Sequence, residues 1–191
     1  MYKRQLEERH KFLTDELADV TKTRQDLLQI IHDLDEKMQQ IFKAAFDDTV
    51  REFTAILPTL FPGGVGAMTL TDPNDLLVSG IDVRVKPAGK QWLPMTLLSG
   101  GEQSLGAIAF LMAIFKSRPS PFYIMDEVEA ALDDANLTRL LHVFQDLRTN
   151  SQLILVTHQK RTMEIADTVY GVIMDEGMSR IVGQRLEHNN A

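Results

Sequence analysis

The first segment of the chain, residues 1–57, carries apolar side chains at a regular spacing of seven. These residues are Leu6, Leu13, Val20, Leu27, Leu34 and Ile41. The intermediate heptad positions are His10, Leu17, Arg24, Ile31 and Met38, so two polar residues interrupt the apolar seam. A repeat of seven corresponds to about 3.5 residues per turn, which favours supercoiling with a second helix. Because no proline or glycine precedes Pro58, we predict one long helix over residues 1–57.

Two interpretations of this helix remain open. It either packs along its own domain as an amphipathic helix or forms half of a coiled coil. The sequence contains no second heptad segment, so a coiled-coil partner would lie outside this chain or be supplied by another copy.

The helical pattern stops in residues 57–64, where two prolines and two glycines occur. Residues 80–87 then alternate apolar and charged side chains, which is typical of a strand exposed on one face. Residues 87–90 have the composition of a turn. We therefore expect two domains, a coiled-coil or neck helix over residues 1–57 and a globular lobe over residues 58–191.

The lobe shows the pattern of an α/β fold. Apolar runs at residues 122–125 and 153–156 are typical of strands buried on both faces of a parallel sheet. Residues 105–115 and 135–147 have helical patterns, and the second lies between the two strands, which predicts a β-α-β unit. Residues 169–186 predict two further strands around a turn at Asp175-Glu176-Gly177.

The composition narrows the class of protein. The absence of cysteine excludes disulfides and cysteine-based zinc sites, and no apolar run approaches the roughly 18 residues of a membrane span. The N-terminus shows no signal-peptide pattern. A net charge of −7 is unusual for a domain that binds DNA alone, so any DNA contact would need a local basic patch or other surfaces.

Two acidic residues, Asp126 and Glu127, directly follow the first apolar run. Carboxylates at the carboxyl end of a parallel strand face the crevice where α/β proteins bind ligands. One carboxylate there could hold Mg²⁺ through water, and the other could orient or deprotonate an attacking water. Alternatively, both acids could cap the following helix. His158 follows the second run and could reach the same crevice or serve as a hydrogen-bonded loop histidine.

A second candidate site, Ser99-Gly100-Gly101-Glu102, precedes the first helix of the lobe. Serine is a favoured N-cap, and two glycines allow backbone amides to approach an anion closely. The positive end of the helix dipole favours the same ligand. The pattern therefore predicts a phosphate site, and a simple N-cap is the alternative.

Taken together, these motifs resemble those of ABC-type ATPase heads. Residues 99–102 are similar to the signature motif, and residues 122–127 to Walker B followed by the catalytic glutamate. Residues 131–133 resemble the D-loop, and His158 the switch histidine. The amino-acid sequences of residues 60–64 and 119–136 are similar to those of bacterial SMC (structural maintenance of chromosomes) proteins.

The resemblance implies two heads that enclose two ATP molecules. Ser99 and the amides of Gly100 and Gly101 would bind the γ-phosphate of an ATP held by the opposing head, with Glu102 as part of that nucleotide-binding motif. A kleisin subunit near residues 169–186 and DNA, through the assembled complex, would be further partners. The resemblance also implies a cytoplasmic, nucleoid-associated protein.

The same resemblance assigns roles in hydrolysis. Asp126 would bind Mg²⁺, and Glu127 would polarise the attacking water. His158 would contact the γ-phosphate, and Asp133 would link the two sites across the dimer. ATP hydrolysis would then depend on positioning and charge stabilisation.

The Walker A motif G-x-x-x-x-G-K-[ST] does not occur in the chain. At the one Gly-Lys pair, Gly89-Lys90, the required first glycine is Arg84 and the Ser/Thr position is Gln91. In SMC proteins Walker A lies in the N-terminal half of the head. We therefore expect this chain to be the C-terminal half, inactive until it meets the N-terminal half and dimerises.

Other functions fit the sequence less well. A repair ATPase of the RecN or recombination-nuclease type shares the motifs, but the sequences of residues 61–64 and 129–133 favour the SMC family. A transporter ATPase would not begin with such a coiled coil, and a non-enzymatic scaffold would have no reason to keep Asp126, Glu127 and His158. A serine hydrolase would need glycine where Leu97 stands.

Overall fold

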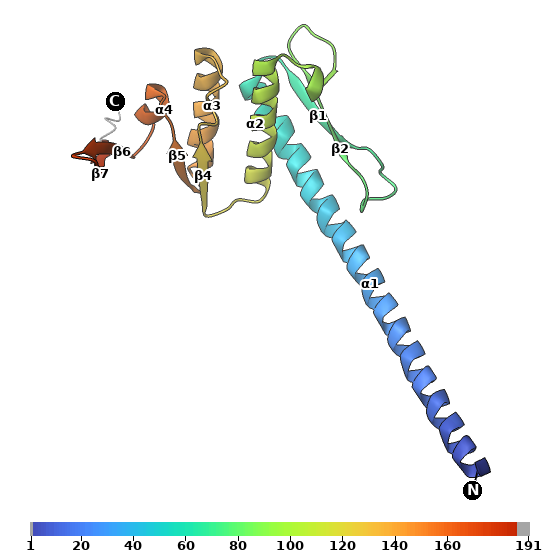
Figure 1. The fold of residues 1–191 in the computed structure, drawn as a ribbon. Helices are drawn as coiled ribbons and strands as arrows, with labels where there is room; N and C mark the ends of the chain where they lie inside the picture. Colours follow the sequence, from blue (N-terminus) through green and yellow to red (C-terminus); the bar gives the residue numbers. More distant parts are fainter. Residues whose placement is uncertain (1, 187–191) are drawn as a thin grey trace. The chain divides into compact units, whose positions relative to one another are not determined.

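The computed structural model describes residues 2–186 of the chain and shows a mixed α/β protein (Figure 1). The described residues form two units: α1 up to Asp47 together with the segment Leu70–Gly80, and the remainder. In chain order the elements are α1 (Tyr2–Leu60), β1 (Val65–Leu70), β2 (Ile81–Lys86), β3 (Leu93–Pro94), a 3₁₀ turn (Met95–Leu97), α2 (Gly100–Ser117), β4 (Phe122–Asp126), α3 (Asp134–Leu147), β5 (Gln152–Val156), α4 (Lys160–Glu164), β6 (Thr168–Asp175) and β7 (Met178–Arg185).

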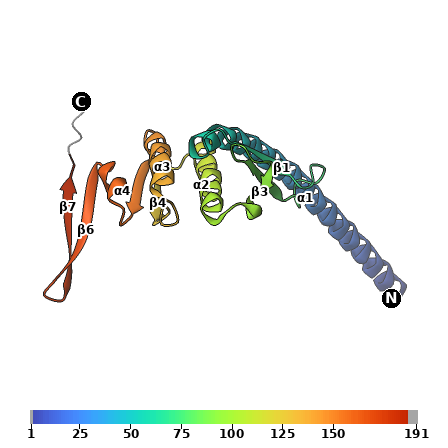
Figure 2. The ribbon, with the colours of Figure 1, turned by 90° about the horizontal axis from the view of Figure 1, so that it is seen from above.

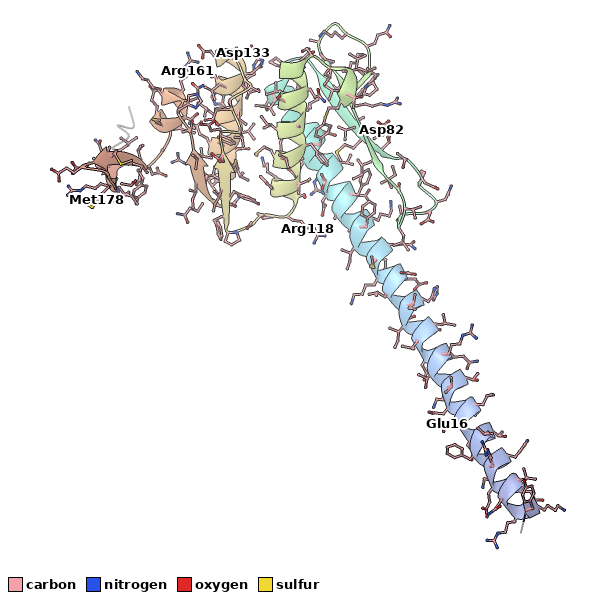
Figure 3. The ribbon with its side chains drawn as sticks, in the orientation of Figure 1. Glu16, Asp82, Arg118, Asp133, Arg161 and Met178 are labelled. Carbon is pink, nitrogen blue, oxygen red and sulfur yellow. The ribbon has the colours of Figure 1, made fainter. Side chains whose placement is uncertain are left out.

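Helix α1 is a single helix of 59 residues, as the heptad pattern predicts. Its apolar seam is open to solvent along the whole length: Leu6 is 58% exposed, Leu27 56% and Ile41 53%. Side chains project all around this helix in Figure 3. Within the helix itself these six apolar positions have no cover, and the choice between the two interpretations stays a prediction.

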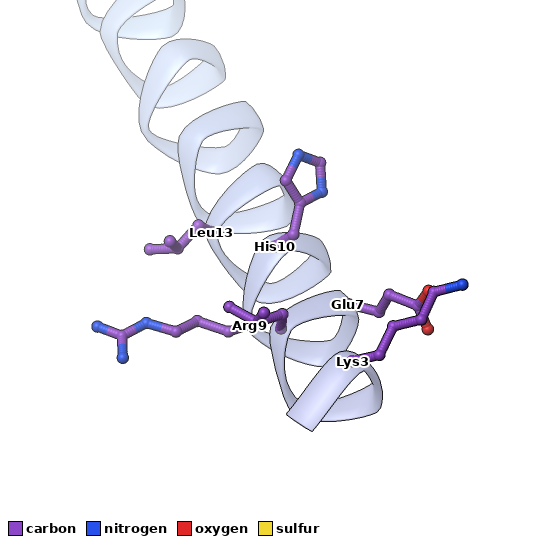
Figure 4. Close-up of a pocket in the computed structure, with 6 residues that line it drawn as sticks. Lys3, Glu7, Arg9, His10 and Leu13 are labelled. Atoms are coloured by element: carbon purple, nitrogen blue, oxygen red, sulfur yellow. The ribbon is translucent and has the colours of Figure 1, made fainter. Parts of the chain in front are cut away.

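A shallow depression on α1 is lined by residues of that helix alone (Figure 4). Its floor includes Leu6 and Leu13 of the apolar seam, and Lys3 and Glu7 form an ion pair at its edge, with 3.9 Å between Nζ and Oε1. A hollow between side chains of one helix offers no converging groups to a small ligand. We therefore regard it as part of the seam.

The end of α1 lies three residues beyond the Leu57 boundary predicted from the sequence. Pro58 lies inside the last turn, although proline removes a hydrogen bond from a helix. Leu57 and Leu60 on either side of it are fully buried, and this burial offsets the lost bond. Gly63, at φ 73°, then turns the chain out of the helix.

The lobe contains the predicted β-α-β unit. Strands β4 and β5 pair in parallel, from Phe122 opposite Gln152 to Asp126 opposite Val156, and α3 connects them. The predicted terminal strands form an antiparallel hairpin, β6–β7, which Figure 2 shows side by side. A separate three-stranded sheet has the order β1-β2-β3.

One expectation about β4 and β5 is wrong: these strands are not buried on both faces. Met125 is 6% exposed, but Ile124 is 66% exposed and Val156 52%. The side chains on this face have no cover within the described residues. The sequences of β4 and β5 are apolar enough for strands covered on both faces, but the described part of the chain covers only one face.

The core of the lobe is built from the buried faces of its helices. Helices α2 and α3 contribute Leu105, Ala109, Met112, Leu140 and Phe144, and α1 contributes Phe53 and Leu57. No helix among residues 2–186 is long and apolar enough to cross a membrane.

Candidate functional site

The carboxyl ends of β4 and β5 place the predicted catalytic residues at one edge of the sheet. The parallel register pairs Asp126 with Val156, and the amide of Glu127 donates to the carbonyl of Val156 over 2.9 Å. The residues that follow each strand therefore leave the sheet side by side. The structure thus brings Asp126 and Glu127 together with His158.

Glu127 and His158 are in direct contact. Oε1 of Glu127 lies 3.3 Å from Nδ1 of His158, and both side chains are more than half exposed. The backbone of Glu127 has φ 45°, in the left-handed region that residues other than glycine seldom adopt. Such conformations concentrate at functional sites, where surrounding structure holds them. The exposed pair can therefore face a ligand while the backbone at the ends of β4 and β5 fixes its geometry.

Asp126 is exposed at the last position of β4. No cluster of three or more potential metal-ligating side chains occurs among residues 2–186. A cation that Asp126 bound would thus take its other ligands from water and substrate oxygens. Magnesium is commonly held in this way in nucleotide sites, so one exposed carboxylate fits Mg²⁺ and not a metal that requires a full protein cage.

Asp133 is the N-cap of α3. Its Oδ1 accepts a hydrogen bond of 2.8 Å from the amide of Asn136. The alternative that Asp126 and Glu127 cap the following helix is therefore wrong, because Asp133 caps α3. Figure 3 labels Asp133 at the start of α3 and Arg161 on α4. Arg161 donates to the backbone of Asp134 at 3.2 Å, which holds these two helix starts together.

The predicted signature residues form a capping box at the start of α2. The amide and the hydroxyl of Ser99 both donate to Oε2 of Glu102, over 3.2 and 2.7 Å. The ammonium of Lys90, on the turn between β2 and β3, lies 2.8 Å from Oε1 of the same carboxylate. These hydrogen bonds, from Lys90 first and then from Ser99, lower the pKa of Glu102 to about 2. Glu102 is therefore a permanent anion at neutral pH that orients Ser99.

Gly100 and Gly101 leave the first turn of α2 open. A Cβ atom added at either position would meet no atom within 4 Å. The amides of a first helical turn lack intrahelical partners and carry the positive end of the helix dipole. An anion can thus approach this backbone closely, as the sequence predicts.

The two groups of residues have separate supports. The side-chain hydrogen bonds of Ser99 and Glu102 described above connect α2 with Lys90, whereas Asp126, Glu127 and His158 depend on β4 and β5.

Sequence reasoning missed two contributions to these sites. Lys90 was assigned to a turn and considered as a failed Walker A lysine, but its pairing with Glu102 was not foreseen. Glu129 received no role, yet it is 3% exposed and bonded to two threonines beyond β5. An acid within the small, apolar stretch around residues 128–132 was the available signal.

Comparison with protein families gives a match over residues 16–180 to the family described as RecF/RecN/SMC N terminal domain. That description names an N-terminal domain, whereas the motifs led us to expect a C-terminal half. The match thus supports the family and does not confirm our choice of half.

Curated relatives are chromosome partition proteins. The chain is 56% identical over 182 residues to the chromosome partition protein Smc of Mycobacterium leprae and 53% identical to that of Mycobacterium tuberculosis. Each alignment covers 95% of this chain and 15% of the relative. The chain therefore spans about a seventh of the length of these proteins.

Solved structures of SMC heads share the fold. A Pyrococcus furiosus Smc head with an extended coiled coil, bound to the C-terminal domain of ScpA, is 33% identical with a TM-score of 0.75, covering 94% of this chain and 45% of that one. A structure from a study of ATP-driven dimerisation and DNA-stimulated activation of SMC ATPases is 36% identical with a TM-score of 0.70, covering 76% and 89%. These similarities confirm the predicted α/β fold of an ABC-type SMC head, and the chain belongs to the RecF/RecN/SMC family, with homology to part of the chromosome partition protein Smc.

Proposed function

We propose that this chain is the part of an SMC-type ATPase head that supplies the signature motif, Walker B acid, catalytic glutamate, D-loop and switch histidine to a composite ATP site. The observation that carries the proposal is the contact between Glu127 and His158 at the end of a parallel strand pair that also presents Asp126. This set provides a ligand for magnesium, a base and a polar partner in one place.

The proposed mechanism assigns one task to each side chain. Asp126 is the candidate ligand of Mg²⁺, whose chemistry when bound is to neutralise charge on phosphate oxygens. Glu127 accepts a hydrogen bond from the attacking water and polarises its O–H bond, which makes the water oxygen more nucleophilic. His158, held against Glu127, keeps that carboxylate aligned and faces the γ-phosphate. Catalysis depends on positioning and charge because phosphoryl transfer needs little covalent help from the protein.

Ser99, Gly100 and Gly101 bind a phosphate held by the opposing head in this proposal. The open backbone of the two glycines admits the anion, and Glu102 with Lys90 fixes the orientation of Ser99. Asp133, at the start of α3, links the two sites across the dimer.

We further propose that the chain is the C-terminal half of the head. Its sequence lacks a G-x-x-x-x-G-K-[ST] segment, so an ATP-binding lysine loop would come from another part of the protein. The exposed apolar face of β4 and β5 supports this view, because such strands are normally covered on both sides. The chain matches 45% of the Pyrococcus furiosus chain, which supports a part of the head and does not distinguish its two halves.

The partners of the whole protein follow from homology. The Pyrococcus furiosus head is bound to the C-terminal domain of ScpA, and we propose an equivalent kleisin for this chain. ATP-driven pairing with a second head, DNA contact through the assembled complex and a cytoplasmic, nucleoid-associated location belong to the same proposal. The curated relatives are chromosome partition proteins, which favours this role over DNA repair.

A pair of substitutions tests the two sites separately in a head assembled with its Walker A half. Glu127→Gln keeps the side-chain shape but removes the base, so ATP-driven dimerisation should persist while turnover falls at least about a hundredfold. Ser99→Arg fills the phosphate turn, so dimerisation should be lost while ATP still binds the Walker A half.

Chromatography in the presence of ATP measures dimerisation of the two variants, and steady-state phosphate release measures their turnover. Turnover that survives in Glu127→Gln would remove Glu127 as the base. Unchanged dimerisation in Ser99→Arg would remove residues 99–102 as the phosphate turn.

A further inference from the structure

Glu129 is a buried acid in the segment between β4 and α3. The residue is only 3% exposed. Placing a carboxyl group away from water is costly unless hydrogen bonds compensate for the lost solvation. A position of this kind therefore needs a structural or functional reason.

Two threonine hydroxyls supply the compensating bonds. Thr157 Oγ1 and Thr162 Oγ1 both donate to Oε1 of Glu129, the second over 3.1 Å. Thr157 lies directly after β5, and Thr162, which is 1% exposed, lies on α4. Thr157 Oγ1 also accepts the amide of Gln159 over 3.0 Å. One carboxyl oxygen thus joins the segment after β4 to the segment after β5 and to α4.

These bonds lie next to the candidate catalytic pair. Glu129 follows Glu127 by two residues, and Thr157 is adjacent to His158. The amide of Ala130 donates to the carbonyl of Glu127 over 3.1 Å, so the backbone between Glu127 and Glu129 is already folded into a turn. Movement of Glu129 relative to Thr157 would therefore move Glu127 relative to His158.

The backbone pairing of the two strands ends before this point. The last bond between them joins the amide of Glu127 to Val156, and Glu127 itself has the unfavourable φ of 45°. Beyond that bond, Glu129 with its two threonines is a buried side-chain connection between the two segments, and Arg161 of α4 adds a more exposed one to Asp134. A residue at positive φ keeps its conformation only when its surroundings hold it.

We propose that Glu129, Thr157 and Thr162 form a buried clamp of positioning residues that sets the spacing between Glu127 and His158. The clamp acts through the catalytic pair. This inference rests on the proposed ATPase function and extends it by naming what holds the hydrolytic geometry.

Thr157→Val is the main test because valine has nearly the same shape and lacks the hydroxyl. In the assembled head, kcat for ATP should fall by about 10- to 100-fold, the cost of misplacing a reacting group by up to about an ångström. KM for ATP and ATP-driven dimerisation should stay within about twofold, since neither depends on this spacing. Thr157→Ser, which restores the hydroxyl, should recover the rate.

Thr54→Val is the matched control. Thr54 lies on α1, is exposed and donates its hydroxyl only to the carbonyl of Val50 in the same helix. Its replacement removes a threonine hydroxyl without touching the clamp, and kcat should be unchanged. Thr162→Val provides a second clamp variant with the same expected loss if Thr157→Val fails to fold.

A double substitution separates positioning from general damage. If the clamp acts through His158, adding Thr157→Val to His158→Ala should cost less than about twofold in kcat, because the effects of coupled residues do not add. An equal loss in both backgrounds would overturn the proposal.

A spectroscopic readout is independent of ATP turnover. The ¹⁵N signals of the His158 ring, measured in the chain alone, should shift in Thr157→Val, while those of His142 on α3 should not. Unchanged His158 signals would overturn the clamp whatever the ATPase assay gives. An active wild-type head with unaffected Thr157→Val turnover would reject the clamp alone, whereas an inactive wild-type head with shifted His158 signals would reject the proposed function.

Discussion

At the residue scale, the best-defined electrostatic feature is the Glu102 carboxylate at the start of α2. Lys90 and Ser99 both bond to it, and these bonds lower its pKa from 4.5 to about 2. A carboxylate whose folded-state pKa is depressed stabilises the folded state above its ordinary pKa. That stabilisation is lost as pH falls from about 4.5 towards about 2.

Lys90→Met should raise the pKa of Glu102, because it removes the largest cause of the shift while keeping an unbranched side chain. The carboxyl ¹³C signal of Glu102, followed by NMR during an acid titration of the chain, gives this pKa directly. The Lys86→Met variant is the control, since Lys86 is an exposed lysine at the end of β2. A pKa that stays near 2 in Lys90→Met would show that Lys90 does not hold Glu102.

The predicted site residues could be found from sequence because each follows a recognisable element. Asp126 and Glu127 follow one apolar strand, and His158 follows the other, so their meeting is a consequence of parallel pairing. The bond between Glu129 and Thr157 could not be found in this way, because the residues are 28 positions apart and neither belongs to a periodic pattern. The pairing of Lys90 with Glu102 likewise depends on how a turn meets a helix.

At the element scale, β1 packs against the last turns of α1 through a glycine. A Cβ atom at Gly66 would lie 2.6 Å from the ring of Phe53 and 2.9 Å from a methyl group of Leu57. Both neighbours are fully buried, so neither can move aside easily. The strand can approach the helix this closely only without a side chain at position 66.

Gly66→Ala should therefore lower the free energy of unfolding of the chain by about 1–3 kcal/mol, the usual cost of overpacking a core. Urea denaturation followed by circular dichroism measures this change. Gly101→Ala is a suitable control, because its Cβ would meet nothing within 4 Å and alanine is favoured in helices. Equal stability of Gly66→Ala and the parent chain would contradict the described packing of β1 on α1.

Most elements were predictable because their periodicity is strong. The heptad pattern gave α1, and the apolar runs gave β4 and β5 with α3 between them. The end of α1 was misplaced because burial of Leu57 and Leu60 outweighs the helix-breaking effect of Pro58. We wrongly expected both faces of β4 and β5 to be buried. An apolar run shows that a strand needs cover on both faces, but it does not show whether the same chain provides that cover.

At the scale of the whole molecule, the chain carries surfaces that it does not cover. The seam of α1, one face of β4 and β5, and much of β6–β7 expose large apolar side chains, among them Leu13, Ile124, Val172 and Ile181. Exposed apolar surface of this extent marks sites of interaction with other protein. The chain spans 15% of its curated relatives, which is consistent with cover from other parts of such a protein.

At this scale, the proposed ATP site is composite, with parts from more than one segment of the protein. In the proposed mechanism, the chain supplies the phosphate-binding turn at residues 99–102 and the hydrolytic group Asp126, Glu127 and His158. Its sequence offers no Walker A segment to hold the nucleotide. Neither this chain nor a Walker A half should therefore hydrolyse ATP at a useful rate alone.

The most direct measurement is Mg²⁺-dependent phosphate release from ATP by this chain, by a matching Walker A half-head and by their mixture. We predict turnover in the mixture only, and its loss when the chain carries Glu127→Gln. Rapid hydrolysis by the pure chain, or a mixture no more active than the sum of its halves, would contradict the account.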